Sequence, residues 1–500
     1  MINKKHIKTI SLITAAATAL SVASCSKTTS TSETVATSKE TVITAEATAT
    51  ESSEETSVTE TTKAVSLEDI TVNEEVSSSS DSEHAIEVSG DSKSYSNIKV
   101  TKTGDSDQGD KADFYGDNAA VFATDGATLT LTDIVVDTDG THANAVFSYG
   151  DGTTVNISNA VITTSGNCSG GLMTTGGGTM NATNLNIHTT GNSSAAIRSD
   201  RGGGTVNVDG GYYITEGKGS PVIYSTADIT VSNAYLESTS SQGVVVEGKN
   251  SVTLNNVELV ADNNSKNSDK SDVYQAVMIY QSMSGDASVG LATFTMTGGS
   301  LTNKNGDVFF VNNTSTTITL ENVEIVNQDA DGVFLRAAAA GWGSSGSNGG
   351  KVNLYLNNQI LEGDIVIDEI SVLNMYMRSG TTYTGAINTG NEGEVYVEIE
   401  SGSKWVLTGD SYITSLTCDA DAIDLNGYTL YVNGVAYSSG TSSSGDAIAI
   451  VSESSENGGG PGSGHEAPPD GGPGSGHEAP PDGGPGGNAN GGPGEPPDEV

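Results

Sequence analysis

Residues 116–139 read GDNAAVFATDGATLTLTDIVVDTD, and the chain then repeats this pattern with variation. The next copies are ANAVFSYGDGTTVNISNAVITTSG at 143–166, GGLMTTGGGTMNATNLNIHTTG at 170–191 and AAIRSDRGGGTVNVDGGYYITEG at 195–217. Each copy contains three short strands of alternating residues, joined by Gly, Asn, Asp, Ser and Thr. A period of about 25 residues is the length of one solenoid coil, not of a helix pair or a propeller blade. The repeat therefore predicts a parallel β-solenoid.

The second strand of each copy has the clearest alternation. Leu129 and Leu131 alternate with threonine, and the same period of two continues to Ile318 and Leu320. Just after this strand a polar residue recurs at one coil position: Asp133, Asn159, Asn184, Asn233, Asn256 and Asn322. We interpret this ladder as an inward turn in which asparagines stack on one another and satisfy the bent backbone. Such a ladder is typical of right-handed parallel β-helices, which residues 65–437 resemble. We therefore expect an all-β, right-handed parallel β-helix of about 14 coils, each rising by about 4.8 Å.

A second resemblance lies near the end of the repeat region. Residues 401–416, SGSKWVLTGDSYITSL, are similar to a phrase of β-helical bacterial adhesins in which Trp-x-x-Thr-Gly-x-Ser recurs. Together the two resemblances imply a pectate-lyase-like solenoid in a bacterial surface lipoprotein of adhesin-like type. Three insertions, at 262–272, 282–291 and 337–350, break the period. Insertions in a solenoid form loops on its side, and such loops often mark the working face.

Both ends of the chain differ from the repeats. Residues 1–24 combine a basic start with a short apolar run, which predicts a secretory signal, and the small residues before Cys25 resemble a lipobox. We therefore expect lipidation at Cys25 and a protein that is exported across the plasma membrane and lipid-anchored at the bacterial cell surface. Residues 25–64 are rich in Ser and Thr and predict a disordered linker, and residues 438–500 predict a disordered Gly/Pro-rich tail with two copies of GGPGSGHEAPPD.

The charge balance narrows the range of partners. The chain has 21 Lys and Arg residues against 63 Asp and Glu, a formal net charge of −42. Such a surface repels phosphates, so nucleic acid is not an expected partner. The membrane is expected to be reached through the lipid anchor alone. Cys168 and Cys418 lie far apart in a solenoid, so we expect two small buried thiols and no disulfide.

The first strand of each copy predicts a surface stripe. We align the copies on an inward aliphatic residue: Val121, Val146, Leu172, Ile197, Val222, Val244, Val277, Val308 and Val333. The residues after these positions then point outward. They form an exposed apolar and aromatic stripe bordered by the insertion loops, and a one-residue slip would bury it instead. The ligand-binding candidates on this face and its loops are Phe122, Phe147, Tyr149, Met173, Arg198, Asp200, Arg201, Met278, Tyr280, Phe309, Phe334, Arg336 and Trp342.

Two groups of charged residues suggest chemistry. Arg198, Asp200 and Arg201 share one strand and its end, where two arginines and a carboxylate suit contact with an anionic ligand, although such a trio is more often a surface ion pair. Asp105, Asp107, Asp110 and Asp113 supply carboxylate oxygens for Ca²⁺, although their spacing is not that of an EF-hand and also fits a charged cap loop. The family phrases of galacturonan hydrolases are absent from the sequence.

These observations predict a non-catalytic protein that presents the β-helix for adhesion or for binding a polysaccharide or a host or cell-surface glycoprotein. We assign no catalytic residue and no cofactor, with Ca²⁺ as the one metal considered. The first alternative is a calcium-dependent lyase of uronate polymers, for which the arginines would serve as base. The second is a structural surface spacer that self-associates through the stripe.

Overall fold

The computed structural model describes residues 64–450. The predicted signal peptide at 1–24, the lipidation of Cys25, the linker at 25–63 and the tail from 451 onward lie outside the described residues. Within 64–450, no helix has the length and apolar character needed to cross a membrane.

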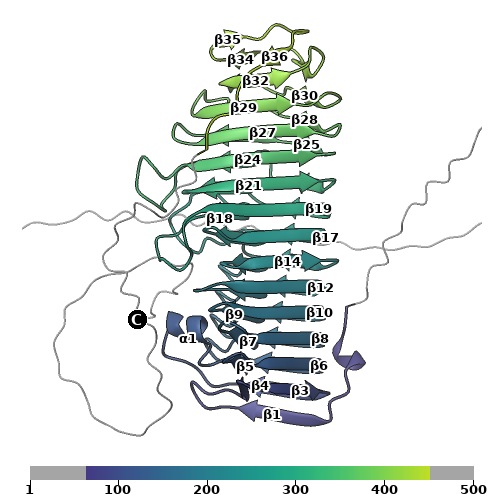
Figure 1. The fold of residues 1–500 in the computed structure, drawn as a ribbon, viewed down its shortest axis with the longest axis vertical. Helices are drawn as coiled ribbons and strands as arrows, with labels where there is room; N and C mark the ends of the chain where they lie inside the picture. The colour runs from purple at the N-terminus through teal and green to yellow at the C-terminus, as the bar shows by residue number, and fades with distance from the viewer. Residues whose placement is uncertain (1–63, 451–500) are drawn as a thin grey trace, which may run out of the picture. The chain divides into compact units, whose positions relative to one another are not determined.

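The described chain is a parallel β-helix, as the repeats predict (Figure 1). Its largest sheet, here called the long-strand sheet, has 18 strands. Three of its coils carry two strands each and β36 pairs antiparallel, so the sheet passes through fourteen parallel coils. Its strands are β1 (Glu74–Ser78), β3 (Ser92–Ser96), β4 (Ile98–Lys102), β6 (Thr128–Thr138), β8 (Thr154–Thr164), β10 (Gly178–Thr189), β12 (Gly204–Thr215), β14 (Asp228–Ser232), β15 (Tyr235–Ser238), β17 (Ser251–Ala261), β19 (Leu291–Asn303), β21 (Thr314–Glu321), β22 (Glu324–Asn327), β24 (Gly350–Asn357), β27 (Val372–Arg378), β29 (Glu394–Ile399), β32 (Ser415–Cys418) and β36 (Ser443–Ser444).

The first strand of each repeat forms a separate sheet of 11 strands, here called the short-strand sheet. Its strands are β2 (Ile86–Ser89), β5 (Val121–Thr124), β7 (Val146–Tyr149), β9 (Leu172–Thr175), β11 (Ile197–Ser199), β13 (Ile223–Ser225), β16 (Val244–Glu247), β18 (Gln275–Tyr280), β20 (Asp307–Asn312), β23 (Val333–Ala337) and β26 (Asp364–Ile367). Two small sheets complete the C-terminal coils: β25 (Ile360–Glu362), β28 (Thr382–Thr384), β30 (Lys404–Val406) and β33 (Ile423–Asp424), then β31 (Ser411–Ile413), β34 (Leu430–Val432) and β35 (Val435–Ala436).

The interior is built by stacking apolar residues of successive coils. Leu129 pairs with Val155, Val155 with Met180 and Met180 with Val206, and all four side chains are buried. Because the parallel register keeps equivalent residues one above the other, each apolar side chain covers the one below it. The alternation seen in the sequence is therefore the interior face of the long-strand sheet.

The asparagine ladder has a structural role, but it does not point inward. Asn159, Asn184 and Asn233 have φ of 51°, 54° and 53°, in the left-handed region, and they bend the chain between two extended segments. Asn184 Nδ2 donates to Asn159 Oδ1 at 2.9 Å, so the side chains do stack. They are half-buried or exposed, because the left-handed bend turns them toward the outer surface. Asparagine suits this position since it tolerates a positive φ better than other side chains do.

The register of the short-strand sheet agrees with most of the predicted alignment and departs from it at three strands. The inward positions that agree are Val121, Val146, Leu172, Ile197, Val244 and Val277. Ile223, Phe309 and Leu335 occupy the inward positions, instead of Val222, Val308 and Val333. Phe309 and Phe334 are consequently core residues, and their ring centroids lie 5.4 Å apart inside the β-helix. The prediction that these two phenylalanines face a ligand is wrong. The coils differ in length and β23 contains an irregularity between Val333 and Leu335, so an alignment by sequence alone slips.

Two further elements differ from expectation. Residues predicted as a charged loop form a short helix, α1 (Asp110–Tyr115), which Gly116 ends with a left-handed φ of 75°. The other is the C-terminal cap, which continues beyond residue 437. There β36 pairs with β32, and the backbone of Ile448 exchanges two hydrogen bonds with the side chain of Asn374. A 3-10 helix, η1 (Leu67–Asp69), precedes β1.

Candidate functional site

The outward column of the short-strand sheet is the predicted stripe, and the structure shows that it is covered. Two apolar clusters lie on this outer face, apart from the main core. The first contains Ala119, Phe122, Phe147 and Met173 with Tyr149 at its edge, and the second contains Ala195, Tyr224, Val245, Met278, Tyr280 and Phe310 with Trp342 at its edge. The outward direction was predicted correctly for Phe122, Phe147, Met173 and Met278, but their exposure was not, since each is at least nine-tenths buried.

The cover comes from α1 and from the insertions. Phe122 and Phe147 lie so close to Gly116, at the end of α1, that a Cβ there would come within 2.6 Å of the Phe122 ring. Trp342, from the loop between β23 and β24, packs edge-on against Tyr280 with ring centroids 5.2 Å apart. An apolar stripe of this size favours such a cover because water contact with it is unfavourable.

Arg198 lies between the two apolar clusters and is the centre of a buried ion network. Its guanidinium contacts Asp113 of α1 at 3.0 Å and Asp200 at 2.8 Å. Burial raises the pKa of the Asp200 carboxyl to about 7, because removal from water outweighs the effect of Arg198. Burial acts in the same direction on Asp113, but Arg198, His142 and Asn144 hold the pKa of the Asp113 carboxyl below its usual range.

Asp113 also connects α1 to the coils beneath it. His142 Nδ1 lies 3.1 Å from Asp113 Oδ1, and Asn144 Nδ2 donates to the same oxygen at 3.1 Å. Burial disfavours the imidazolium, yet the bond to Asp113 raises the pKa of His142 above its usual value. These contacts, with those of Arg198, fix the position of α1 on the outer face.

Arg201 adds a second attachment for α1. Its guanidinium carbon lies 4.0 Å from the centroid of the Phe114 ring, and its Nε donates to Asp286 Oδ1 at 2.9 Å. Asp286 belongs to the loop between β18 and β19, so one arginine joins α1 to an insertion loop. Arg198, Asp200 and Arg201, which the sequence singled out together, are therefore all part of one site.

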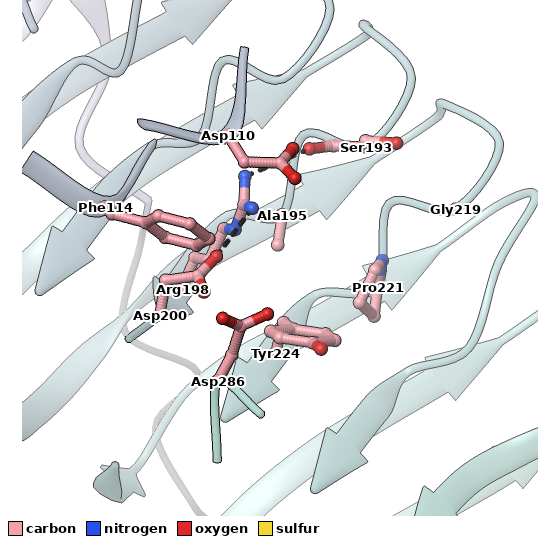
Figure 2. A pocket seen from close by; sticks show the side chains of 10 residues that line it. All are labelled: Asp110, Phe114, Ser193, Ala195, Arg198, Asp200, Gly219, Pro221, Tyr224 and Asp286. Atoms are coloured by element: carbon pink, nitrogen blue, oxygen red, sulfur yellow. Dashed lines mark hydrogen bonds and ion pairs between the residues drawn. The ribbon is translucent and has the colours of Figure 1, made fainter. Parts of the chain in front are cut away.

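A pocket opens beside this network, between α1 and the β18–β19 loop (Figure 2). The hollow is shallow: its cavity volume is about 50 Å³, and the larger empty space of about 510 Å³ includes open solvent. Figure 2 shows side chains from α1, the short-strand sheet and the insertion loop around one hollow. The pocket is lined by Asp110, Phe114, Ser193, Ala195, Arg198, Asp200, Gly219, Pro221, Tyr224 and Asp286. The wall thus combines three aspartates with two aromatic rings and a paired arginine.

A buried acid supports one side of this pocket. Glu247 is 1 % exposed, and its Oε2 accepts hydrogen bonds from the hydroxyls of Tyr224 and Tyr280. Burial raises the pKa of the Glu247 carboxyl above its usual range and that of the Tyr224 hydroxyl well above its own. Tyr224 is therefore part of the pocket wall, while Tyr280 lies behind the wall and is linked to Tyr224 through Glu247.

The structure separates the four predicted calcium ligands. Asp105 is exposed and its Oδ1 accepts the backbone N–H of Thr141 at 2.7 Å, while Asp107 is exposed and bonded to Gln108. Asp110 lines the pocket and Asp113 is in the buried network. Within residues 64–450, the group of three acidic, His or Cys ligands close enough for a metal is Asp113, His142 and Cys168. The predicted set of four aspartates does not form such a group.

The remaining predicted residue, Arg336, pairs with Asp307 at 2.6 Å on the outer face of the next coils. Sequence reasoning missed Asp286, Tyr224, Glu247 and His142 as parts of one region. Two of them could have been recognised in the sequence. Glu247 lies two residues past Val245 and so shares its outward direction, and His142 occupies the same coil position as Cys168.

Comparisons with protein-family models, with curated proteins and with solved structures gave no match. The function must therefore be argued from the site itself.

Proposed function

We propose that this protein is a non-catalytic glycan-binding protein of the bacterial cell surface, held to the membrane by a lipid at Cys25. The proposal rests on the pocket between α1 and the β18–β19 loop, which places carboxylates and aromatic rings around one hollow. The resemblance of the repeats to β-helical surface adhesins, and of the segment before Cys25 to a lipobox, gives the setting.

The composition of the pocket suits a sugar. Carboxylate oxygens are strong acceptors for the adjacent hydroxyls of a pyranose, and Asp110, Asp200 and Asp286 supply them from three different elements. The rings of Phe114 and Tyr224 offer apolar faces on which a sugar ring can stack, and Tyr224 also has a polar end. A concave site with a few polar groups on an apolar wall is the usual form of a small-ligand pocket.

The charge of the pocket points to a neutral or an amino sugar. Arg198 is engaged by Asp113 and Asp200, and Arg201 is engaged by Asp286, so their positive charges are already balanced. A uronate carboxylate would find both guanidinium groups already paired, and it would meet Asp110 as well as the negative charge of the whole chain. The same pairing argues against a uronate lyase, because a paired guanidinium is a poor base for removing a proton.

Self-association through the stripe has less support than ligand binding. The outward residues that would have formed the contact, such as Phe147 and Met173, are fully buried beneath their cover. A second copy of the chain would have to displace α1 to reach them.

A glycan array with the purified full-length chain, followed by calorimetry on the best neutral, amino and uronic sugars, tests the proposal. We expect binding to neutral or amino sugars and a loss of about 10- to 100-fold in affinity for Asp286→Asn, because a hydrogen bond to a charged group contributes about 1.5–3 kcal/mol. The matched control is Asp139→Asn, an exposed aspartate of an ordinary turn, which should bind as the wild type does.

Two outcomes would overturn the proposal. One is the absence of any glycan binding by a chain that melts cooperatively. The other is the growth of unsaturated-uronide absorbance on pectin, which would favour the lyase instead.

A further inference from the structure

We propose that Asp113, His142 and Cys168 form a binding site for one thiophilic divalent cation, with Zn²⁺ as the natural choice. Each residue offers one ligand atom, and the three atoms all lie within 4.8 Å of one another. Asp113 and His142 are buried and Cys168 is half-buried. This inference goes beyond glycan binding and does not depend on it.

The β-helix itself brings His142 and Cys168 together. The backbone N–H of His142 donates to Asn167 O at 2.9 Å, and that of Cys168 donates to Asn192 O at 2.8 Å, so the two residues occupy the same position in consecutive coils. Both have a left-handed backbone, with φ of 57° and 55°. Because successive coils are about 4.8 Å apart, their side chains are stacked at a fixed distance. The next two coils have Ser193 and Gly219 at this position, so the column offers strong ligands only at the coils that α1 covers.

Asp113 supplies the third ligand from α1. Its Oδ1 lies 3.1 Å from His142 Nδ1, close to the roughly 3.3 Å that separates two ligand atoms bound to one tetrahedral zinc ion at about 2.0–2.1 Å. Binding of the ion would replace the proton that the two side chains now share. Arg198 holds the other oxygen, Oδ2, at 3.0 Å and would orient the carboxylate from outside the metal's own ligands.

The charges near the site favour a divalent cation. Asp113 and a Cys168 thiolate would carry two negative charges beside the Arg198–Asp200 pair. A divalent ion would balance these two charges. Cys168 interacts electrostatically with Arg198, and a neighbouring guanidinium stabilises a thiolate. The repulsion between Arg198 and the metal is reduced because the guanidinium is shared by two carboxylates.

The ligand types select the metal. One imidazole, one thiol and one carboxylate suit zinc and its neighbours in the transition series, whereas Ca²⁺ and Mg²⁺ prefer oxygen ligands alone. The protein would supply three ligands, which leaves a fourth position for water. Since Asp113 belongs to α1, and α1 supplies Asp110 and Phe114 to the pocket wall, the ion would fasten that wall to the coils.

The test is a Co²⁺ titration of the full-length chain carrying Cys25→Ser, so that the cysteine outside the described residues contributes nothing. Cobalt reports a cysteine ligand directly through a thiolate-to-metal charge-transfer band. We expect one equivalent of Co²⁺ to produce this band and Zn²⁺ to remove it. Cys168→Ser should abolish the band. His142→Asn should weaken cobalt binding at least tenfold, because the ion would lose one of its three protein ligands.

Two matched controls keep the test specific. Cys418→Ser removes the other described thiol, which is buried near the C-terminal cap, and should leave the band unchanged. His465→Ala with His477→Ala removes the tail histidines and should also leave it unchanged. The proposal is overturned if no band forms, if Cys168→Ser retains it, or if Cys418→Ser removes it.

A second measurement covers the case in which a variant folds poorly. Hydrogen exchange of the amides of α1 in the chain with native Cys168 and His142 should slow at least tenfold when Zn²⁺ is added, because the ion ties Asp113 to two coils. Exchange that is the same with and without Zn²⁺ would contradict the proposal. Glycan binding is measured separately, so its failure leaves the metal result intact.

Discussion

The two faces of the short-strand sheet follow different rules. The inner face repeats one aliphatic position from coil to coil, from Val121 through Val146 and Leu172, and its side chains stack into one continuous core. On the outer face, the residue at the equivalent position changes from one strand to the next, from phenylalanine through Arg198 to Tyr224 and valine. Regular stacking stabilises the solenoid. The change of residue type creates a polar centre between two apolar clusters, and that centre is where a site can form.

Adjacent residues of β20 offer the strongest test of this difference. Phe309 faces the core and Phe310 faces outward, and both are buried. We expect Phe309→Ala to lower the free energy of unfolding by about 3–5 kcal/mol, because its neighbours in the coils above and below cannot collapse into the cavity. Denaturant unfolding followed by circular dichroism gives the measurement.

Phe310→Ala is the matched variant. Loop residues around Trp342 cover Phe310, and a loop can settle more readily than a β-coil, so the loss should be smaller, about 1–3 kcal/mol. An equal or larger loss for Phe310→Ala would mean that the outer cluster is as essential to the fold as the core.

The ion network should make stability depend on pH through Asp200. The pKa of its carboxyl is about 7 in the folded state, above the unfolded value of 3.8, so the folded protein holds an extra proton between these values. The contribution of the Asp200 carboxyl to the free energy of unfolding is therefore complete below about pH 4. This contribution is lost as the pH rises toward 7. We expect Asp200→Asn to remove about 1–3 kcal/mol of this pH dependence, measured by unfolding at pH 4 to 8.

Other groups of the same face must be separated from Asp200. The raised pKa of Glu247 acts in the same direction, and the lowered pKa of Asp113 acts in the opposite direction at lower pH. Comparison of Asp200→Asn with the wild type at each pH isolates the one group. Curves that run parallel from pH 4 to 8 would show that Asp200 titrates as an ordinary exposed aspartate.

The smallest expected effect is in the asparagine ladder, which belongs to the regular stacking of the coils. Asn184→Ala removes the hydrogen bond to Asn159 and places alanine, which tolerates a positive φ poorly, at a φ of 54°. We expect the free energy of unfolding to fall by about 1–2 kcal/mol. Asn184→Gly loses the same bond but accepts the positive φ, and should be the milder variant by thermal melting. If glycine is the more damaging of the two, the side-chain ladder matters more than the backbone bend.

Much of the fold followed from the period of the repeats. Alternation at positions such as Leu129 and Val155 has a period of two that only an extended strand satisfies, and a coil length of about 25 residues then requires parallel stacking. The alignment slipped only where coils change length, at Ile223, Phe309 and Leu335. At those places the register depends on turns and irregularities that no local pattern reveals.

The candidate site was predicted in part. The sequence singled out Arg198, Asp200 and Arg201, which are neighbours along the chain, and the structure keeps them in one site. It missed Asp286, which reaches Arg201 from 85 residues away in a loop. It also took Asp113 for a calcium ligand beside Asp110, whereas a helical turn directs Asp113 into the sheet and leaves Asp110 exposed.

By itself, the sequence determined the solenoid, its parallel strands and the outward direction of residues such as Phe147, since these follow from local periodicity. Only the tertiary structure decided whether that outward face is open. Contacts of α1 and of two loops with the sheet join residues tens of positions apart, such as Asp113 with Arg198. Which segment covers an apolar face depends on how well its shape and charge match that face in the folded chain. The repeat pattern carries no information about this match.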